Sequence, residues 1–137
     1  MPHDPVRAAY THQWFSKASK DLRRVALLLS ASPPDTEDAL FHCQQAVEKT
    51  LKGFLTWHDQ PFRRVHNLGE LGKQCLQIDP TLESLVDRAS SLTEYAWTFR
   101  YPGDTTEPSL EEARDSFELA REVLEAVLGR LPDELRP

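Results

Sequence analysis

Apolar residues recur at helical spacing in every long segment of this chain, and this pattern restricts the fold more than any other feature of the sequence. The cleanest stripe, whose members return to one face every three or four residues, consists of Leu82, Leu85, Val86, Ala89, Leu92, Thr93 and Ala96. No segment shows the sustained apolar and polar alternation of a half-buried strand, and the chain has only five glycines for tight turns. The sequence therefore predicts an all-α protein.

Residues that start helices divide the chain into five segments. Asp35 or Thr36, Asn67 and Ser109 are suited to N-terminal caps because their side-chain oxygens accept hydrogen bonds from the first free amides of a helix. Ser109 and Glu112 also form a Ser-x-x-Glu capping box. The expected helices cover residues 10–30, 36–57, 68–78, 82–99 and 110–131. This order predicts an antiparallel up-and-down helical bundle of four long helices plus one short helix.

The last expected helix is apolar on two faces. One seam consists of Leu110, Ala113, Phe117, Ala120, Leu124, Val127 and Leu131. A second, shorter seam consists of Leu119, Val123 and Ala126. Two apolar faces require two packing partners, which leaves two explanations open: the helix lies at the centre of the bundle, or its second face forms a homodimer interface.

The size of the chain, 137 residues, is that of one globular domain, whose core we expect between residues 12 and 128. Residues 132–137 are expected to form a frayed tail. The longest apolar run, residues 25–29, is far shorter than the roughly 20 residues of a membrane span. The first residues show no secretory signal, and Cys43 and Cys75 show no metal or redox spacing, so we expect free thiols in a cytoplasmic protein without membrane contact.

The net charge of −6 argues against a protein that coats nucleic acid electrostatically. The charge is unevenly distributed, however. Residues 1–68 hold 9 basic and 7 acidic side chains, whereas residues 69–137 hold 7 basic and 15 acidic ones. A ligand that carries phosphate is therefore expected on the first half of the chain.

None of the compact motifs of familiar enzymes is present in the sequence. The chain lacks a phosphate-binding GxxxxGK[ST] loop, a dinucleotide-binding GxGxxG, an esterase GxSxG and a zinc-binding HExxH. Its five histidines include no pair at i, i+4 on one helix. We therefore expect no metal and no cofactor, with a nucleotide as the one ligand class left open.

Polar residues on the second helix form one candidate cluster. Gln44, Glu48 and Lys52 follow one another at i, i+4 spacing, and the order of Glu48 and Lys52 favours a helical ion pair. This spacing is typical of a solvated helix face, which we take as the first expectation. The alternative is that these residues belong to a structural or functional site.

Two further places carry polar and aromatic residues. At the loop-to-helix junction after Arg63 and Arg64, His66 either packs locally or belongs to a site. In the segment 92–102, Arg100 either satisfies the last carbonyls of a helix or holds a phosphate with its two-pronged guanidinium group.

Taken together, these segments resemble the HEPN family, the nucleotide-binding domains of higher eukaryotes and prokaryotes. The resemblance covers roughly residues 12–128 and rests on Trp14, Ala18-x-x-Asp21-Leu22, Ala39-x-Phe41-x-x-Gln44-Gln45-Ala46-x-Glu48-Lys49-x-Leu51-Lys52, His66-Asn67-Leu68, Leu92-Thr93-x-Tyr95-x-x-x-x-Arg100-Tyr101-Pro102 and Glu112-Ala113. It implies an antiparallel bundle that commonly dimerises. It also implies a bacterial protein encoded beside a small nucleotidyltransferase-type partner, as a toxin–antitoxin or related pair.

Many HEPN members are metal-independent ribonucleases that use an arginine followed a few residues later by a histidine. This sequence keeps Arg100, but residues 101–107 contain no histidine. If the chain is an endoribonuclease, the resemblance implies that Arg100 stabilises charge on the phosphate, and His66 is the candidate for proton transfer. The departure from the pattern favours a binding protein and leaves enzymatic activity open.

The leading hypothesis is a dimeric, non-catalytic HEPN-type domain that binds a nucleotide, an RNA or a nucleotidyltransferase partner. The residues assigned to a shared nucleotide-binding pocket are Lys49, Lys52, His66, Tyr95, Arg100 and Tyr101. Cations would hold the phosphates, a tyrosine would stack on the base, and Gln44 and Glu48 are assigned a structural polar role. Besides the binding protein and the endoribonuclease, a third hypothesis is an interaction module whose polar residues only stabilise the bundle. The sequence specifies neither the nucleotide nor a toxin or antitoxin role.

Overall fold

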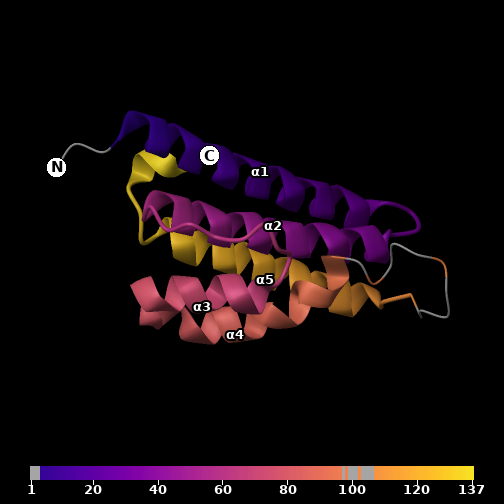
Figure 1. The fold of residues 1–137 in the computed structure, drawn as a ribbon. Coiled ribbons are helices and arrows are strands. Elements are labelled where there is room, and N and C mark those ends of the chain that lie inside the picture. The colour runs from indigo at the N-terminus through magenta and orange to yellow at the C-terminus, as the bar shows by residue number, and fades with distance from the viewer. Residues whose placement is uncertain (1–3, 97, 99–101, 103–106) are drawn as a thin grey trace.

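The computed structural model describes residues 4–96, 98, 102 and 107–137, and all regular structure within them is helical. The α-helices are α1 (Pro5–Ser30), α2 (Thr36–Trp57), α3 (Leu68–Ile78), α4 (Glu83–Ser90) and α5 (Leu110–Leu128). Three short 3-10 helices accompany them: η1 (Pro80–Leu82), η2 (Ser91–Ala96) and η3 (Asp133–Leu135). Figure 1 shows the helices side by side in a bundle, which confirms the predicted fold class.

The central helix is α2, which packs against α1, α3, α5 and η2. It buries 15 of its 22 residues, more than a helix with one covered face would bury. The last helix, α5, is therefore not the central one. Its second seam is already covered in part within one chain, because Val123 is buried and Leu119 and Ala126 are partly buried. That seam does not by itself require a second copy of the chain.

The expected N-terminal caps of the later helices are confirmed. Asp35, Asn67 and Ser109 accept hydrogen bonds from backbone amides three residues ahead, at 3.1, 3.0 and 3.0 Å. The first helix begins earlier than expected, because Asp4 caps it by accepting from the amides of Val6 and the following residue. Such caps satisfy amides that have no partner inside a helix.

The fourth expected helix is shorter than its apolar stripe suggested. The α-helix ends at Ser90, and the chain continues as the 3-10 helix η2. Ser90 and Ser91 donate their hydroxyls to the carbonyls of Asp87 and Arg88, three residues back, a local bond that competes with regular helix geometry. The tighter η2 turn packs against α2 and α3. Because α4 ends at Ser90, the bundle has three long α-helices and two short ones, rather than the four long helices and one short helix expected from the sequence.

The C-terminal residues do not form the frayed tail expected from the sequence. Asp133–Leu135 form η3, which packs against α1, and Leu135 is only 1% exposed. Arg136 adds an ion pair with Glu125 of α5 at 3.2 Å. The apolar side chain of Leu135 anchors this end because its burial stabilises the docked conformation.

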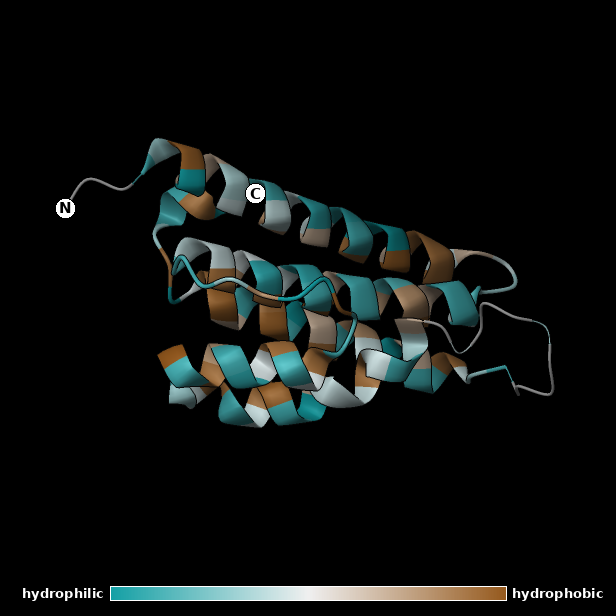
Figure 2. Cartoon of the chain, in the orientation of Figure 1, coloured by the Kyte–Doolittle hydropathy of each residue, from teal (hydrophilic) through white to brown (hydrophobic). Residues whose placement is uncertain are grey.

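The core lies where the apolar faces of the helices meet, as the hydropathy colouring in Figure 2 illustrates. On α1, Phe15 is fully buried, whereas the neighbouring Trp14 is only partly buried. The ring of Phe15 lies against Gly53 of α2, where an added Cβ would meet its Cε1 at 2.7 Å. Gly53 therefore lets the two longest helices approach closely.

Gly72 allows a similarly close approach between α3 and α4. A Cβ built on Gly72 would overlap the Cγ1 of Val86. We expect Gly72→Ala to lower the free energy of unfolding by about 1–2 kcal/mol, because overpacking outweighs the better helix propensity of alanine. Urea denaturation measures the change. Since space is the cause, the same substitution should cost much less in a Val86→Ala background, and an equal cost in both backgrounds would contradict this explanation.

Candidate functional site

Glu48 lies at the centre of a buried polar cluster on α2. Its side chain is 6% exposed, and it accepts hydrogen bonds from Gln44 Nε2 at 3.1 Å and from Lys52 Nζ at 3.1 Å. Its Oε1 also lies 2.7 Å from His66 Nδ1. Gln44 and Lys52 come from the same helix, one turn before and one turn after, whereas His66 comes from the loop between α2 and α3. The carboxylate thus ties this loop to the central helix.

Aromatic rings shield Lys52 from solvent. Its side chain is 9% exposed, and Nζ lies 5.8 Å from the ring centroid of Trp14 and 5.7 Å from that of Phe62. Both distances are within the range of a cation–π interaction. The two rings also meet edge to face, with centroids 6.1 Å apart. Lys52 is therefore fixed between α1 and the loop.

His66 is the exposed member of the cluster, with 59% of its side chain accessible. Gln44 Nε2 donates to the His66 carbonyl at 3.2 Å, which fixes the backbone, and Glu48 fixes the ring. Because a carboxylate accepts, Nδ1 carries the proton in this hydrogen bond, and the other ring nitrogen, Nε2, is then the basic atom of the neutral imidazole. In this form Nε2 can accept a proton, and once protonated it can donate a hydrogen bond to a phosphate.

A second polar cluster joins α1 to α2. Asp21 is 7% exposed, and its two oxygens lie 2.9 Å from His42 Nδ1 and 2.6 Å from Lys49 Nζ. Asp38 lies 3.6 Å from the other ring nitrogen of His42. The sequence had assigned Lys49 to the nucleotide pocket, whereas the structure pairs it with Asp21. An acidic residue between the core positions Ala18 and Leu22 was the signal for this partner.

The structure corrects the expectation of a solvated face for Gln44, Glu48 and Lys52. All three are buried, at 0, 4 and 8% exposure, because the loop and α1 cover this side of α2. The expected Glu48–Lys52 ion pair is present. Gln44 and Glu48, to which the sequence assigned a structural polar role, are bonded to each other inside this cluster.

The described residues assigned to the nucleotide pocket do not share one site. Lys52 and His66 meet at Glu48, whereas Lys49 is paired with Asp21. Tyr95 donates its hydroxyl to Glu112 of α5 at 2.7 Å. Burial and this carboxylate raise its pKa, which keeps the phenol protonated. Arg100 and Tyr101 lie outside the described residues.

Thr93, which the sequence placed in the apolar stripe and in the family-like pattern without a role at the site, also belongs to this region. Its hydroxyl accepts the amide of Leu68 at 3.0 Å and so joins η2 to the start of α3, next to His66. The sequence contained no signal for this contact, since it depends on how η2 crosses the end of the loop.

The two cysteines are free and buried, as expected. Burial raises the pKa of Cys43 and of Cys75 to about 12, which keeps both as thiols rather than reactive thiolates. Among the described residues, no group of three or more metal-binding side chains is arranged to hold an ion. Within the same part of the chain, no helix has the length and hydrophobicity needed to cross a bilayer.

The chain matches a known protein family over most of its length. The model of the HEPN domain matches residues 11–131, which is nearly the whole chain. The chain belongs to the HEPN family. No curated protein and no solved structure matches it. The matched region of this HEPN domain contains both polar clusters and the loop that carries His66.

A separate histidine, His58, makes the stability of this HEPN domain depend on pH. Burial lowers its pKa below the usual value of about 6.5, and Arg7 lowers it further, against a smaller opposing effect of Asp79. The unfolded chain therefore takes up this proton first on acidification, so we expect the free energy of unfolding to fall as the pH drops through 6.5 and to level off below the folded pKa.

Urea denaturation at pH 7.5 and 5.5 measures this loss of stability. In His58→Gln the loss should be smaller than in the parent. An identical loss in parent and variant would contradict the assignment to His58.

Proposed function

We propose that this HEPN domain binds a nucleotide, with His66 as the residue that contacts its phosphate. The observation that carries the proposal is the pairing of an exposed imidazole with a buried carboxylate, Glu48, at 2.7 Å. Glu48 already holds the His66 ring in one orientation. A ligand that binds this ring therefore costs less conformational entropy. The site is thus prepared for a ligand on its solvent side.

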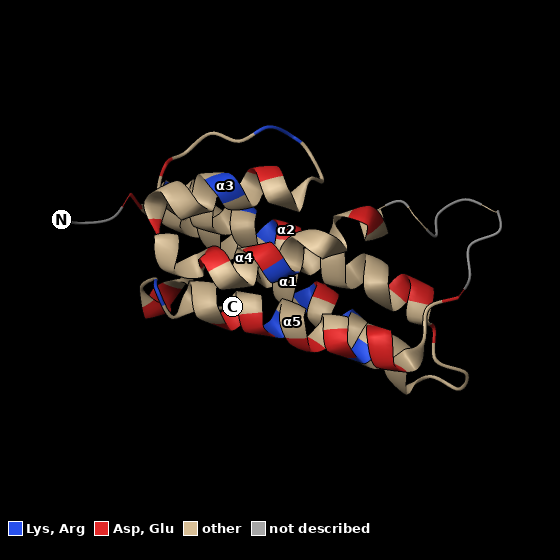
Figure 3. Cartoon of the chain, turned by 90° about the horizontal axis from the view of Figure 1, so that it is seen from below, with Lys and Arg blue, Asp and Glu red and all other residues tan. Residues whose placement is uncertain are grey.

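Charge around His66 supports an anionic ligand. Lys52 and Lys49 are each neutralised by a carboxylate, so the lysines contribute less than the sequence suggested. The loop before His66 also presents exposed Arg64, and Arg63, which is 78% exposed but is itself paired with Glu70 at 3.1 Å. Figure 3 shows this loop, with its basic residues in blue, apart from the acidic residues in red along α5. One guanidinium group can donate two parallel hydrogen bonds to the oxygens of a phosphate. The exposed arginines of this loop therefore favour a phosphate on this side of the molecule.

Calorimetric titration with each common nucleoside triphosphate tests the proposal. We expect binding of at least one, and a weakening of about tenfold in His66→Ala, the size of one lost charge-assisted hydrogen bond. His12→Ala is the matched control, because this histidine of α1 lies outside the cluster and bonds to Ser16 at 3.5 Å. Absence of heat with all nucleotides, or equal affinity in the two variants, would contradict the proposal.

The same geometry favours a metal-independent endoribonuclease as a second candidate. A base at Nε2 of His66, oriented by Glu48, is the group that would remove the proton from a ribose 2′-hydroxyl. Cleavage of a labelled RNA in the presence of a chelator, lost in His66→Gln and in Arg100→Ala, would support this activity. An inactive parent protein that binds a nucleotide would favour the binding function alone.

We further propose a homodimer that acts beside a nucleotidyltransferase-type protein in a toxin–antitoxin-like pair. Membership of the HEPN family supports this proposal. Sedimentation should give twice the chain mass of 15.7 kDa, and a mass of one chain at working concentration would exclude the dimer. A neighbouring gene for a small nucleotidyltransferase, and co-purification of the two proteins, would support the pair.

A further inference from the structure

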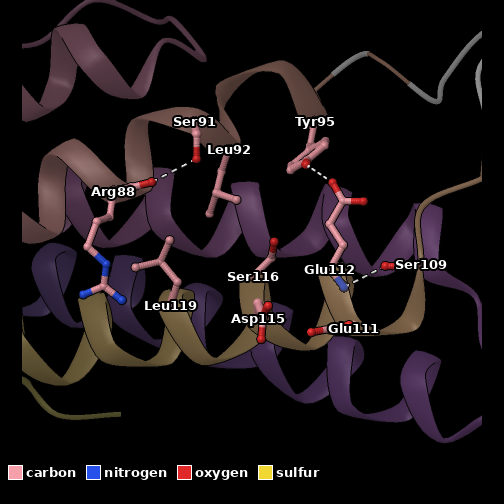
Figure 4. A pocket seen from close by; sticks show the side chains of 10 residues that line it. All are labelled: Arg88, Ser91, Leu92, Tyr95, Ser109, Glu111, Glu112, Asp115, Ser116 and Leu119. Carbon is pink, nitrogen blue, oxygen red and sulfur yellow. Dashed lines mark hydrogen bonds between the residues drawn. The ribbon is translucent and has the colours of Figure 1, made fainter.

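A cavity on the opposite side of the chain from the basic loop lies between α5 and the segment α4–η2. Its volume is about 510 Å³. Figure 4 shows its lining residues, which are Arg88, Ser91, Leu92, Tyr95, Ser109, Glu111, Glu112, Asp115, Ser116 and Leu119. We call this cavity the α5 pocket. The nucleotide site proposed at His66 uses none of these residues. The sequence had assigned Tyr95 to that site, but the structure places it in this pocket, bonded to Glu112.

The α5 pocket carries a net negative charge. Arg88 is paired with Glu122 through two hydrogen bonds, at 3.3 and 3.2 Å, and Glu112 accepts the Tyr95 hydroxyl. Glu111 and Asp115 are exposed, and no described cation pairs with either. Two carboxylates one turn apart thus remain available on the pocket wall.

Ser116 supplies a second, independent indication of a ligand. The residue is 8% exposed and its side chain lines the pocket, yet its hydroxyl bonds to no described residue. In Figure 4 the hydroxyl points into the space below Leu92 and Tyr95. Most polar side chains buried to this extent have a protein partner, whereas this hydroxyl is left to bond whatever occupies the pocket. The free hydroxyl is therefore an acceptor for a donor that enters the pocket.

The apolar part of the pocket restricts the ligand further. Leu92 is 3% exposed and Leu119 is partly buried, and both line the pocket together with Ser116. A ligand that fits must combine an aliphatic stem with a cationic, hydrogen-bonding head. Arginine has this form, since its stem packs on apolar surface and its planar head binds carboxylates and stacks on aromatic rings such as that of Tyr95.

We propose that the α5 pocket docks an arginine-bearing segment of a partner protein. One arginine head reaches the Ser116 hydroxyl, and the exposed carboxylates Glu111 and Asp115 hold the cations of this segment at the rim. Charge complementarity with this acidic wall selects a basic segment and excludes nucleic acid from this side of the molecule.

Titration of ¹⁵N-labelled protein with a blocked peptide of alternating arginine and alanine tests the proposal. We expect amide shift changes centred on Leu92, Ser116 and Leu119. The double variant Glu111→Gln/Asp115→Asn should bind about tenfold more weakly, the effect of two lost ion pairs. Ser116→Ala should also weaken binding, while its urea midpoint stays equal to or above that of the parent, because the hydroxyl has no described partner to lose.

The matched control is Glu83→Gln/Asp87→Asn. It also removes one glutamate and one aspartate, both exposed and both on α4 outside the pocket. Equal weakening by the two double variants, shift changes scattered over the surface, or no binding of the peptide would each overturn the proposal. Equally tight binding of spermidine to the pocket would also overturn it, since the site would then take a small polyamine rather than a protein segment.

Discussion

Glu48→Gln lowers the free energy of unfolding by about 3–5 kcal/mol. The expected cost is large because Lys52 loses the carboxylate that neutralises it at 3.1 Å while its side chain stays 9% exposed. A buried charge without a partner costs more than the net gain from the original pair. His66 loses its acceptor as well. Urea denaturation monitored by circular dichroism at 222 nm measures the change.

Two further variants separate this explanation from a general effect of losing a charge. Glu118→Gln removes a carboxylate that is 68% exposed, and it should change stability by less than about 1 kcal/mol. Adding Lys52→Met to Glu48→Gln removes the unpaired charge and should restore at least half of the lost stability. A cost below about 1 kcal/mol for Glu48→Gln, or no recovery in the double variant, would show that the cluster is not a desolvated ion pair.

Asp21→Asn lowers the free energy of unfolding by about 2–3 kcal/mol, the second largest effect that we expect. The substitution keeps the shape of the side chain but removes the charge that meets Lys49 at 2.6 Å and His42 at 2.9 Å. The loss is smaller than for Glu48 because Lys49 is 22% exposed and can turn toward water. Thermal or urea denaturation measures it.

The control for this variant is Asp133→Asn, since that aspartate is 98% exposed. It should leave stability within about 0.5 kcal/mol of the parent. Similar small losses in both variants would mean that the contact between α1 and α2 rests on apolar packing alone. A large loss confined to Asp21→Asn would show that the polar cluster contributes to holding these two helices together.

The candidate site illustrates which parts of the structure local sequence patterns predict. The Glu48–Lys52 pair is local to one helix, so its spacing of four residues was sufficient to predict it. The burial of the pair was not predictable from spacing, because it depends on Trp14 and Phe62, which come from another helix and a loop. For the same reason the sequence placed Tyr95 in the nucleotide pocket, whereas its hydroxyl faces Glu112 of α5.

The sequence by itself determined the helical class, the caps at Asp35, Asn67 and Ser109, and membership of the HEPN family, because these depend on residues close together in the chain or on their order. Tertiary structure decided that α2 is the central helix, that the C-terminus is docked through Leu135, and that Glu48 holds His66. Each of these features depends on contacts between segments that are far apart in the chain. The burial and desolvation of groups in those contacts determine the tertiary arrangement, which local sequence patterns do not specify.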